Sequence, residues 1–231
     1  MNNTAEFDRF ADNYDADLNQ ALSVSGENKD YFARSRVQWL QKCLCALGQK
    51  PVSAMDYGCG IGDTTALLHE YLGLNRIVGL DVSLRSVELA AQKHGSAQCN
   101  FQTFALYRPA GNADLVYCNG VFHHIPVAQR ADSLRFIHDS LRSGGIFALW
   151  ENNPWNPGTR YVMSKCIFDR DAVTIRPSQA VRLVQEQGFN VLRRDFLFFY
   201  PRLLKALRFT EPWMTALPMG AQYLVLCQRV V

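Results

Sequence analysis

With 231 residues, the chain is long enough for one α/β domain and short for two full domains. Hydrophobic residues make up 48% of it and charged residues 19%, values typical of a protein that buries a sizeable core. The net charge of +3 is too small for the concentrated basic surface of a nucleic-acid-binding protein, so no nucleic-acid partner is expected.

The N-terminus and the cysteines indicate a cytoplasmic protein. The first residues lack the basic and apolar segments of a secretory signal, and no apolar run is long enough to cross a bilayer. The seven cysteines include no Cys-x-x-Cys pair, and most lie in apolar stretches, where a reduced thiol packs as a small hydrophobe. We therefore expect a reducing compartment and no metal site.

The first 48 residues are expected to form a helical N-terminal cap. Apolar residues recur at helical spacing after Thr4, a plausible N-cap, up to Leu47. Ser25-Gly26-Glu27-Asn28 divides this region into two helices, and Gly48 and Pro51 end it.

From residue 52 onward, short apolar runs alternate with helical stretches. Strands are expected at 52–57, 76–81, 100–104, 113–119, 146–151, 191–200 and 223–228, and helices at 63–72, 83–94, 127–141 and 178–187. Ser143-Gly144-Gly145 is expected to close the third of these helices. The alternation predicts an α/β fold, with a Rossmann-like, doubly wound, mostly parallel seven-stranded sheet and helices on both faces.

A glycine-rich turn stands where the first strand passes into a helix. Glycines let the backbone bend sharply and approach a ligand closely, and the free N–H groups of the helix follow. Gly58 and Gly60 match the dinucleotide fingerprint, but its third glycine is replaced by Asp63. A carboxylate there repels a pyrophosphate and tolerates the sulfonium and ammonium of S-adenosylmethionine, so the turn favours S-adenosylmethionine over a nicotinamide cofactor.

Asp81 ends the second strand. Its carboxylate can accept hydrogen bonds from both hydroxyls of a ribose. Dinucleotide enzymes use the same device, so Asp81 alone does not discriminate between the two cofactors.

Several segments together resemble the class I S-adenosylmethionine-dependent methyltransferases. Residues 56–62 (Asp-Tyr-Gly-Cys-Gly-Ile-Gly) resemble the first signature of that family, and residues 79–83 (Gly-Leu-Asp-Val-Ser) the second. Residues 114–125 are similar to its fourth-strand segment, and residues 141–147 to the following helix–Gly-Gly–strand unit. Residues 10–15 resemble the family's entry helix.

The resemblance implies an S-adenosylmethionine site. Gly58 and Gly60 would line the methionine part, Asp56 would help to hold the amino group, and Asp81 would bind the ribose. The family's adenine-binding Asp is missing after the third strand, so apolar packing by Phe104 is expected instead. The full set of expected cofactor-binding residues is Tyr14, Asp56, Gly58, Cys59, Gly60, Asp81, Val82, Phe104 and Asn119.

Candidate catalytic residues follow the fourth and fifth strands. His123 and His124 come after the fourth strand and Glu151 ends the fifth, so each can serve as the general base that a hydroxyl acceptor would need. The alternative is that a histidine here packs, hydrogen-bonded, under the next helix.

The loop after Glu151 is rich in Asn and Pro. Substrate contacts are predicted for Asn152, Asn153, Trp155 and Arg160, and the alternative is a structured turn. Residues 168–171 are expected to cap a helix or a lid. Residues 196–209 are expected to form the sixth strand and a buried or capping helix, with a lipid-facing surface as the alternative.

The sequence thus predicts one domain over residues 1–231, divided into a cap (1–48), a cofactor-binding core (49–151) and a substrate side (152–231). The expected function is methyl transfer from S-adenosylmethionine to a small molecule, with oxygen the favoured acceptor. Transfer to nitrogen or carbon, a lipid-linked substrate with weak peripheral membrane contact, and a protein or RNA target stay open. So do a nicotinamide-dependent oxidoreductase and a non-catalytic binding module, and the chain is expected to be a monomer or homodimer.

Overall fold

A computed structural model describes residues 14–169 and 172–230, apart from the side chains of residues 14–17 and 168. The core is one seven-stranded sheet in the order β3-β2-β1-β4-β5-β7-β6. The strands are β1 (Ser53–Tyr57), β2 (Arg76–Asp81), β3 (Cys99–Thr103), β4 (Ala113–Asn119), β5 (Leu141–Asn152), β6 (Phe189–Leu197) and β7 (Gln222–Arg229). Strands β1 to β5 pair in parallel and β7 runs antiparallel to both of its neighbours, so the predicted mostly parallel sheet is confirmed.

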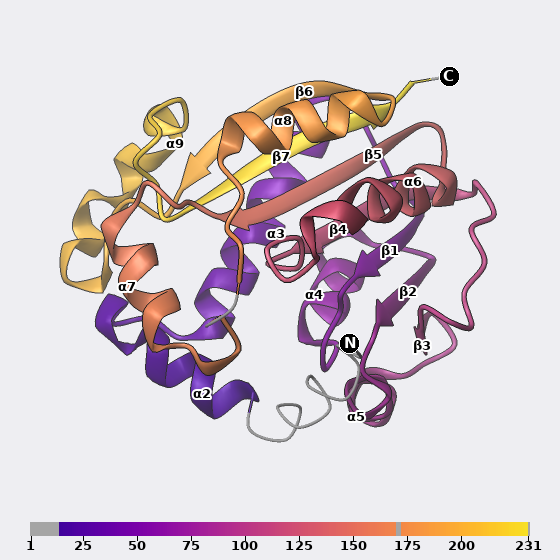
Figure 1. The fold of residues 1–231 in the computed structure, drawn as a ribbon, viewed down its shortest axis with the longest axis horizontal. Coiled ribbons are helices and arrows are strands. Elements are labelled where there is room, and N and C mark those ends of the chain that lie inside the picture. Colours follow the sequence, from indigo (N-terminus) through magenta and orange to yellow (C-terminus); the bar gives the residue numbers. More distant parts are fainter. Residues whose placement is uncertain (1–13, 170–171, 231) are drawn as a thin grey trace.

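Helices cover both faces of the sheet, as predicted (Figure 1). The helices are α2 (Tyr14–Leu22), α3 (Lys29–Ala46), α4 (Asp63–Leu72), α5 (Leu84–His94), α6 (Arg130–Ser140), α7 (Pro157–Lys165), α8 (Pro177–Glu186) and α9 (Glu211–Met214). Leu40 of α3 and Leu68 of α4 are fully buried in one core layer, and Leu134 of α6 and Val184 of α8 in the other. The sheet therefore separates two hydrophobic layers, which is the doubly wound arrangement.

The N-terminal helical region divides where the sequence indicated. A short 3-10 helix η1 (Ser23–Ser25) ends in Gly26 with φ 74°, and Asn28 caps α3 by accepting the N–H of Tyr31. Helix α3 packs in one core layer with residues of the sheet, whereas α2 contacts α7, and residues of both α2 and α3 reach the same cavity. The predicted N-cap Thr4 lies outside the described residues.

Two predicted boundaries were wrong. Helix α6 ends at Ser140, and Ser143-Gly144-Gly145 lies inside β5 instead of closing the helix, because Leu141 is already buried and pairs with Ala113 of β4. Strand β6 ends at Leu197 rather than at residue 200, because Phe198 adopts a left-handed φ of 64° that breaks the strand.

The segment after β6 also differs from the prediction. Residues 202–210 form an irregular 3-10 helix, η4 (Arg202–Thr210), that has no buried residue, so of the expected buried or capping helix the buried alternative is wrong. Within the described residues, no helix is long and apolar enough to cross a membrane.

Candidate active site

The glycine turn after β1 is tied to the end of β2 by backbone hydrogen bonds. The N–H groups of Gly58 and Cys59 donate to the carbonyl of Leu80 at 2.7 and 2.9 Å. The N–H of Gly60 donates to Oδ2 of Asp81 at 2.9 Å. Asp81 also accepts the N–H of Ser83 on Oδ1 at 2.9 Å, so one carboxylate fixes both loops at the edge where parallel strands end.

The two glycines of this turn serve different purposes. Both have positive φ, 80° at Gly58 and 53° at Gly60. A Cβ added to Gly58 would lie 2.3 Å from Cγ2 of Val121, whereas a Cβ added to Gly60 would meet no atom within 4 Å. Gly58 therefore permits protein packing, and Gly60 borders open space that a ligand can enter.

Two polar side chains next to the turn are buried. Asp56 accepts the hydroxyl of Thr65 on Oδ2 at 2.6 Å, and burial raises the pKa of its carboxyl to about 7. The Oδ1 of Asn119, at the end of β4, is buried without a hydrogen-bond partner among the described residues. Leaving a buried hydrogen-bond acceptor without a donor costs free energy, so the Oδ1 of Asn119 is suited to accept a hydrogen bond from a bound ligand.

The remaining predicted cofactor residues lie around this crevice. Cys59 is buried, with its thiol against the carbonyl of Gly60, and Val82 is exposed. Phe104 follows β3 and packs on Tyr57, with a distance of 4.6 Å between ring centroids, so the predicted adenine packing stays a prediction. The side chain of Tyr14 lies outside the described residues.

Asp63 has a different environment from the one that the sequence argument assumed. Its carboxylate is paired with Lys29, with Lys93 at 2.6 Å and with His94 at 2.8 Å. Burial alone would raise the pKa of Asp63, but these three partners hold it well below its usual value. Because the charge is compensated, Asp63 does not repel a phosphate as a lone carboxylate would, and the discrimination against a nicotinamide cofactor rests on other observations.

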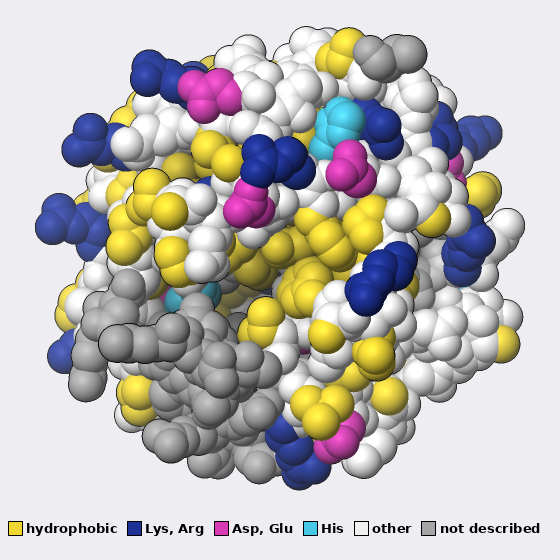
Figure 2. Space-filling view, turned by 45° about the vertical axis from the view of Figure 1, so that its right-hand side comes forward, with side chains coloured by type: hydrophobic (Ala, Val, Ile, Leu, Met, Phe, Trp, Pro, Cys, Tyr) yellow, Lys and Arg dark blue, Asp and Glu magenta, His cyan; other side chains and the backbone are white. Residues whose placement is uncertain are grey.

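A cavity of about 400 Å³ opens beside Asn119. Its walls come from α2, α3, α7, the ends of β4 and β5, and the segment that follows β6. Figure 2 views the molecule from the side of Figure 1 that lies away from α2 and α7, and on that face hydrophobic side chains gather in a hollow with charged side chains around it. We call this cavity of about 400 Å³ beside Asn119 the acceptor cavity.

Arg36 is the buried cation of the acceptor cavity. Its Nε donates to the hydroxyl of Tyr117 at 3.2 Å and its Nη1 to Oε1 of Gln222 at 3.0 Å. The side chain is 7% exposed and forms no ion pair with a carboxylate among the described residues. Sequence analysis missed it because the register of α3 against β4 and β7 is not visible in the local pattern.

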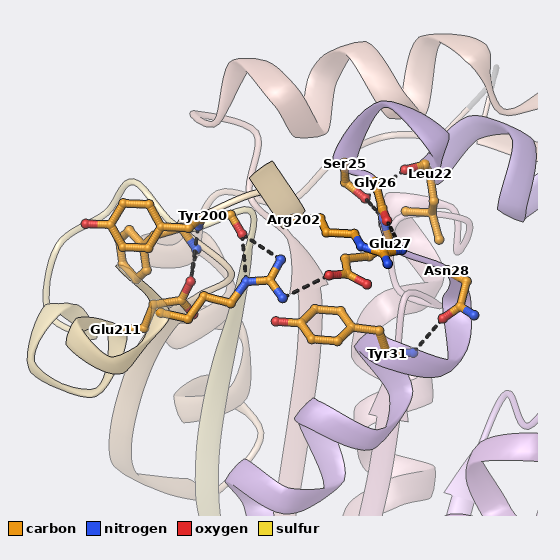
Figure 3. A network of polar contacts seen from close by, with 11 residues as sticks. Leu22, Ser25, Gly26, Glu27, Asn28, Tyr31, Tyr200, Arg202 and Glu211 are labelled. Carbon is orange, nitrogen blue, oxygen red and sulfur yellow. Dashed lines mark hydrogen bonds and ion pairs between the residues drawn. The ribbon is translucent and has the colours of Figure 1, made fainter. Parts of the chain in front are cut away.

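Arg208 lines one wall of the acceptor cavity. Figure 3 shows the network of polar contacts around Glu27, Tyr31 and Tyr200 to which it belongs. Its Nη1 pairs with Oε1 of Glu27 at 2.9 Å, its Nε and Nη2 donate to the carbonyl of Tyr200, and its guanidinium lies 4.5 Å from the ring centroid of Tyr31. These contacts join η4 to the start of α3, although the two segments lie far apart in the sequence. Sequence analysis missed this residue as well.

The candidate bases form one cluster, in which His123 and Glu151 are buried and His124 is partly exposed. Nδ1 of His123 lies 2.6 Å from Oε2 of Glu151, and the Nε2 atoms of His123 and His124 each lie 3.3 Å from Oδ1 of Asp169. Glu151 is 1% exposed and accepts the N–H of Phe122 on its other oxygen. Burial alone would lower the pKa of His123, but Glu151 and Asp169 raise it to about 10. Asp169 thus contacts both histidines, beyond the cap or lid role predicted for its segment.

The predicted substrate residues separate in space. Asn152 lines the acceptor cavity and accepts a hydrogen bond from Gln222 at 3.0 Å. Asn153 is fully buried and donates to the carbonyls of Pro218 and Gly220, as expected of a structured turn. Trp155 and Arg160 are exposed and do not line the cavity, whereas Asn156, which caps α7, and Thr159 of α7 do.

Comparisons with known proteins identify the central part of the chain and its fold. Residues 55–147 match the family model described as a methyltransferase domain. The trans-aconitate 2-methyltransferase of Agrobacterium fabrum is 34% identical over 101 residues, which cover 44% of this chain and 39% of the relative. The enzyme of that name from Escherichia coli is 25% identical over 118 residues, covering 50% of this chain and 45% of the relative. The chain thus matches less than half the length of these curated relatives.

Solved structures share the fold. An S-adenosylmethionine-dependent methyltransferase from Mesorhizobium loti has a TM-score of 0.61 at 19% identity and covers 84% of this chain and 98% of its own. The magnesium protoporphyrin IX methyltransferase from Synechocystis, solved with bound SAH, has a TM-score of 0.60 at 20% identity, with coverage of 91% and 86%. At these identities the likeness concerns the fold, and it confirms the predicted Rossmann-like class.

Proposed function

We propose that this chain, a member of the class I S-adenosylmethionine-dependent methyltransferase family, methylates a small molecule. The proposed acceptor atom is an oxygen of a carboxylate group. The observation that carries the acceptor class is Arg36, a buried guanidinium on the cavity wall whose direct partners among the described residues are both neutral. A buried charge without a counter-ion is costly, and a bidentate carboxylate is its best partner. The name of the curated relatives, trans-aconitate 2-methyltransferase, also describes a carboxylic acid acceptor.

The residues of the crevice fit the cofactor. Open space beside Gly60 leaves room for the methionine part, and the unpartnered Oδ1 of Asn119 can accept a hydrogen bond from the ligand. Asp56 would hold the amino group and Asp81 the ribose hydroxyls. When bound, S-adenosylmethionine supplies a methyl group on a positively charged sulfur. No comparison supports the alternative of a nicotinamide-dependent oxidoreductase.

A carboxylate acceptor simplifies the chemistry. Carboxyl groups have pKa values near 4 and are ionised at neutral pH, so the nucleophile needs no general base. The protein must then align the carboxylate oxygen with the methyl group and exclude water. On this proposal His123, His124 and Glu151 are not required as bases, and a base role for His124 is kept for a hydroxyl acceptor.

The exposed segment after β6 favours a second candidate, a lipid-linked acceptor. Leu203 is 92% exposed and Trp213 79%, with Phe209 and Met219 nearby in sequence, while Pro201 and Arg208 of the same segment line the acceptor cavity. An apolar surface at a cavity wall can bind a membrane that delivers an apolar substrate. Flotation with anionic liposomes tests this candidate, and a chain that stays in the soluble fraction would argue against it.

The carboxylate proposal is tested with Arg36→Gln. We expect the purified chain to methylate a panel of small carboxylic acids that includes trans-aconitate, with the product identified by mass spectrometry. In Arg36→Gln the KM for the acceptor should rise roughly 10- to 100-fold, because a charge-assisted hydrogen bond contributes about 1.5–3 kcal/mol. The affinity for the cofactor, measured by calorimetry, should change little.

Arg34→Gln is the matched control. Arg34 lies two residues earlier on α3, is exposed, and contacts the hydroxyl of Tyr71 at 3.4 Å. Its loss should leave the KM for the acceptor unchanged. If Arg36→Gln instead weakens the cofactor and spares the acceptor, Arg36 binds the methionine carboxylate and the acceptor assignment is wrong.

A further inference from the structure

Three metal-ligating side chains meet at the wall of the acceptor cavity. His123 and His124 follow β4, and Asp169 ends the 3-10 helix η3 (Ile167–Asp169) some 45 residues later in the sequence. One ligand atom from each residue lies within 4.8 Å of the other two. Methylation of a carboxylate needs no general base, so the proposed function assigns no role to this cluster.

The spacing of these atoms suits a metal ion. Oδ1 of Asp169 lies 3.3 Å from Nε2 of His123 and 3.3 Å from Nε2 of His124. Ligand atoms bound about 2.0–2.1 Å from a tetrahedral zinc ion stand roughly 3.3–3.4 Å from one another. The two distances from Oδ1 of Asp169 to the histidine nitrogens therefore already match the ligand–ligand distances of a zinc site.

Glu151 contacts the ring nitrogen of His123 that faces away from Asp169. Its Oε2 lies 2.6 Å from Nδ1 of His123, while its Oε1 is fixed by the N–H of Phe122 at 2.8 Å. A metal-binding histidine usually donates its second ring N–H to such a carboxylate, which orients the ring and directs the other nitrogen toward the ion. The positioning carboxylate is 1% exposed, so this orientation is rigid.

We propose that His123, His124 and Asp169 bind one divalent transition-metal ion of the zinc type, with Glu151 as the positioning residue for His123. Two imidazoles and one carboxylate are the ligand set of open metal sites that keep positions for an exchangeable ligand. All three ligands line the acceptor cavity, where the buried Asn119 also lies, so the open positions face the acceptor. The ion would bind an acceptor oxygen there, in contrast to the sequence expectation of no metal.

The test uses the full chain without cofactor or acceptor, so its outcome is independent of the proposed function. Chelator-treated protein is titrated with Co²⁺, followed by visible absorption and calorimetry, and then with Zn²⁺. We expect one Co²⁺ per chain with the absorption bands of nitrogen and oxygen ligation, displaced by one Zn²⁺. Bound Zn²⁺ should also raise the melting temperature, because it binds the folded state.

Variants separate this site from adventitious binding. Glu151→Gln should weaken Co²⁺ binding by about 10- to 100-fold, and His124→Ala and Asp169→Asn by more than that range. The matched control is His138→Ala, which removes a histidine of a His–Asp pair outside the cluster, 3.4 Å from Asp139, and should leave Co²⁺ binding unchanged.

Two results would overturn the proposal. One is the absence of stoichiometric Co²⁺ and Zn²⁺ binding to the wild type, which would leave His123 as an imidazolium held between two carboxylates. The other is equal binding by wild type and His124→Ala. His124 is only partly buried, so His124→Ala keeps the test valid if Asp169→Asn fails to fold.

Discussion

The cofactor crevice and the acceptor cavity are built in opposite ways. The glycine turn of the crevice and the end of β2 lie within residues 56–83 and hold each other through backbone hydrogen bonds and one carboxylate. The acceptor cavity takes residues from Leu18 to Gln222, joined by side chains such as Arg36 and Arg208. A site that its own backbone defines can be identified from a short motif, whereas a site made by distant side chains cannot.

The largest expected effect is a loss of cofactor affinity caused by a change in the crevice alone. Gly60→Val places a branched side chain in the open space of the crevice, so cofactor affinity should fall at least about 100-fold, which corresponds to roughly 2.7 kcal/mol. Calorimetry with S-adenosylmethionine measures it. Gly48→Val is the control, since Gly48 has a similar φ of 66° and open surroundings away from the site. Equal loss of affinity in both variants would show that backbone strain, and not the crevice, is responsible.

An intermediate effect is expected on the acceptor side alone. Arg208→Gln removes the ion pair to Glu27 and the contacts to Tyr200 and Tyr31, so the free energy of unfolding should fall by about 1–3 kcal/mol. The KM for the acceptor should rise about tenfold as the wall loosens, with cofactor affinity unchanged. Arg202→Gln is the matched control, because the polar contact of exposed Arg202 within the described part of the chain is a long one of 3.4 Å to the carbonyl of Gly26. A changed cofactor affinity in Arg208→Gln would mean that the two regions are not independent.

The smallest effect concerns the pH dependence of the crevice. The pKa of Asp56 is raised to about 7 by burial, so its carboxylate becomes ionised as the pH rises through 7. An ionised Asp56 attracts the ammonium of the cofactor, and affinity should therefore increase several-fold between about pH 6 and 7.5. Asp56→Asn should abolish this dependence in calorimetric titrations, and a wild-type profile in the variant would contradict the assignment.

The raised pKa of Asp56 affects stability in the opposite direction: as the pH rises, cofactor affinity increases but the free energy of unfolding decreases. In the unfolded chain Asp56 ionises near pH 4, about three units below its folded value. Between about pH 4 and 7 the folded state holds the extra proton, so the contribution of this residue to the free energy of unfolding decreases as the pH rises. Asp56→Asn should flatten this slope in thermal denaturation.

The sequence by itself determined the sheet and the position of the glycine turn beside Asp81. The strand–helix alternation placed six of the strands within a few residues of their observed bounds, and the turn at Gly58 and Gly60, with Asp81, lies where the pattern predicted. Backbone periodicity and glycine conformations act locally, so they are visible in short windows of sequence. The start of β5 was missed because the burial of Leu141 against Ala113 of β4 outweighed the turn propensity of the two glycines.

Only the tertiary structure decided the acceptor side. Asp169 meets His123 and His124, and Arg36 reaches Tyr117 and Gln222, because the sheet order brings β4, β5 and β7 together and α3 crosses their ends. The partners of Asp63 were likewise hidden, since Lys29 and His94 come from other helices. Electrostatic contacts between distant segments depend on the packing of whole elements, and that packing has no signature in the sequence around any one of these residues.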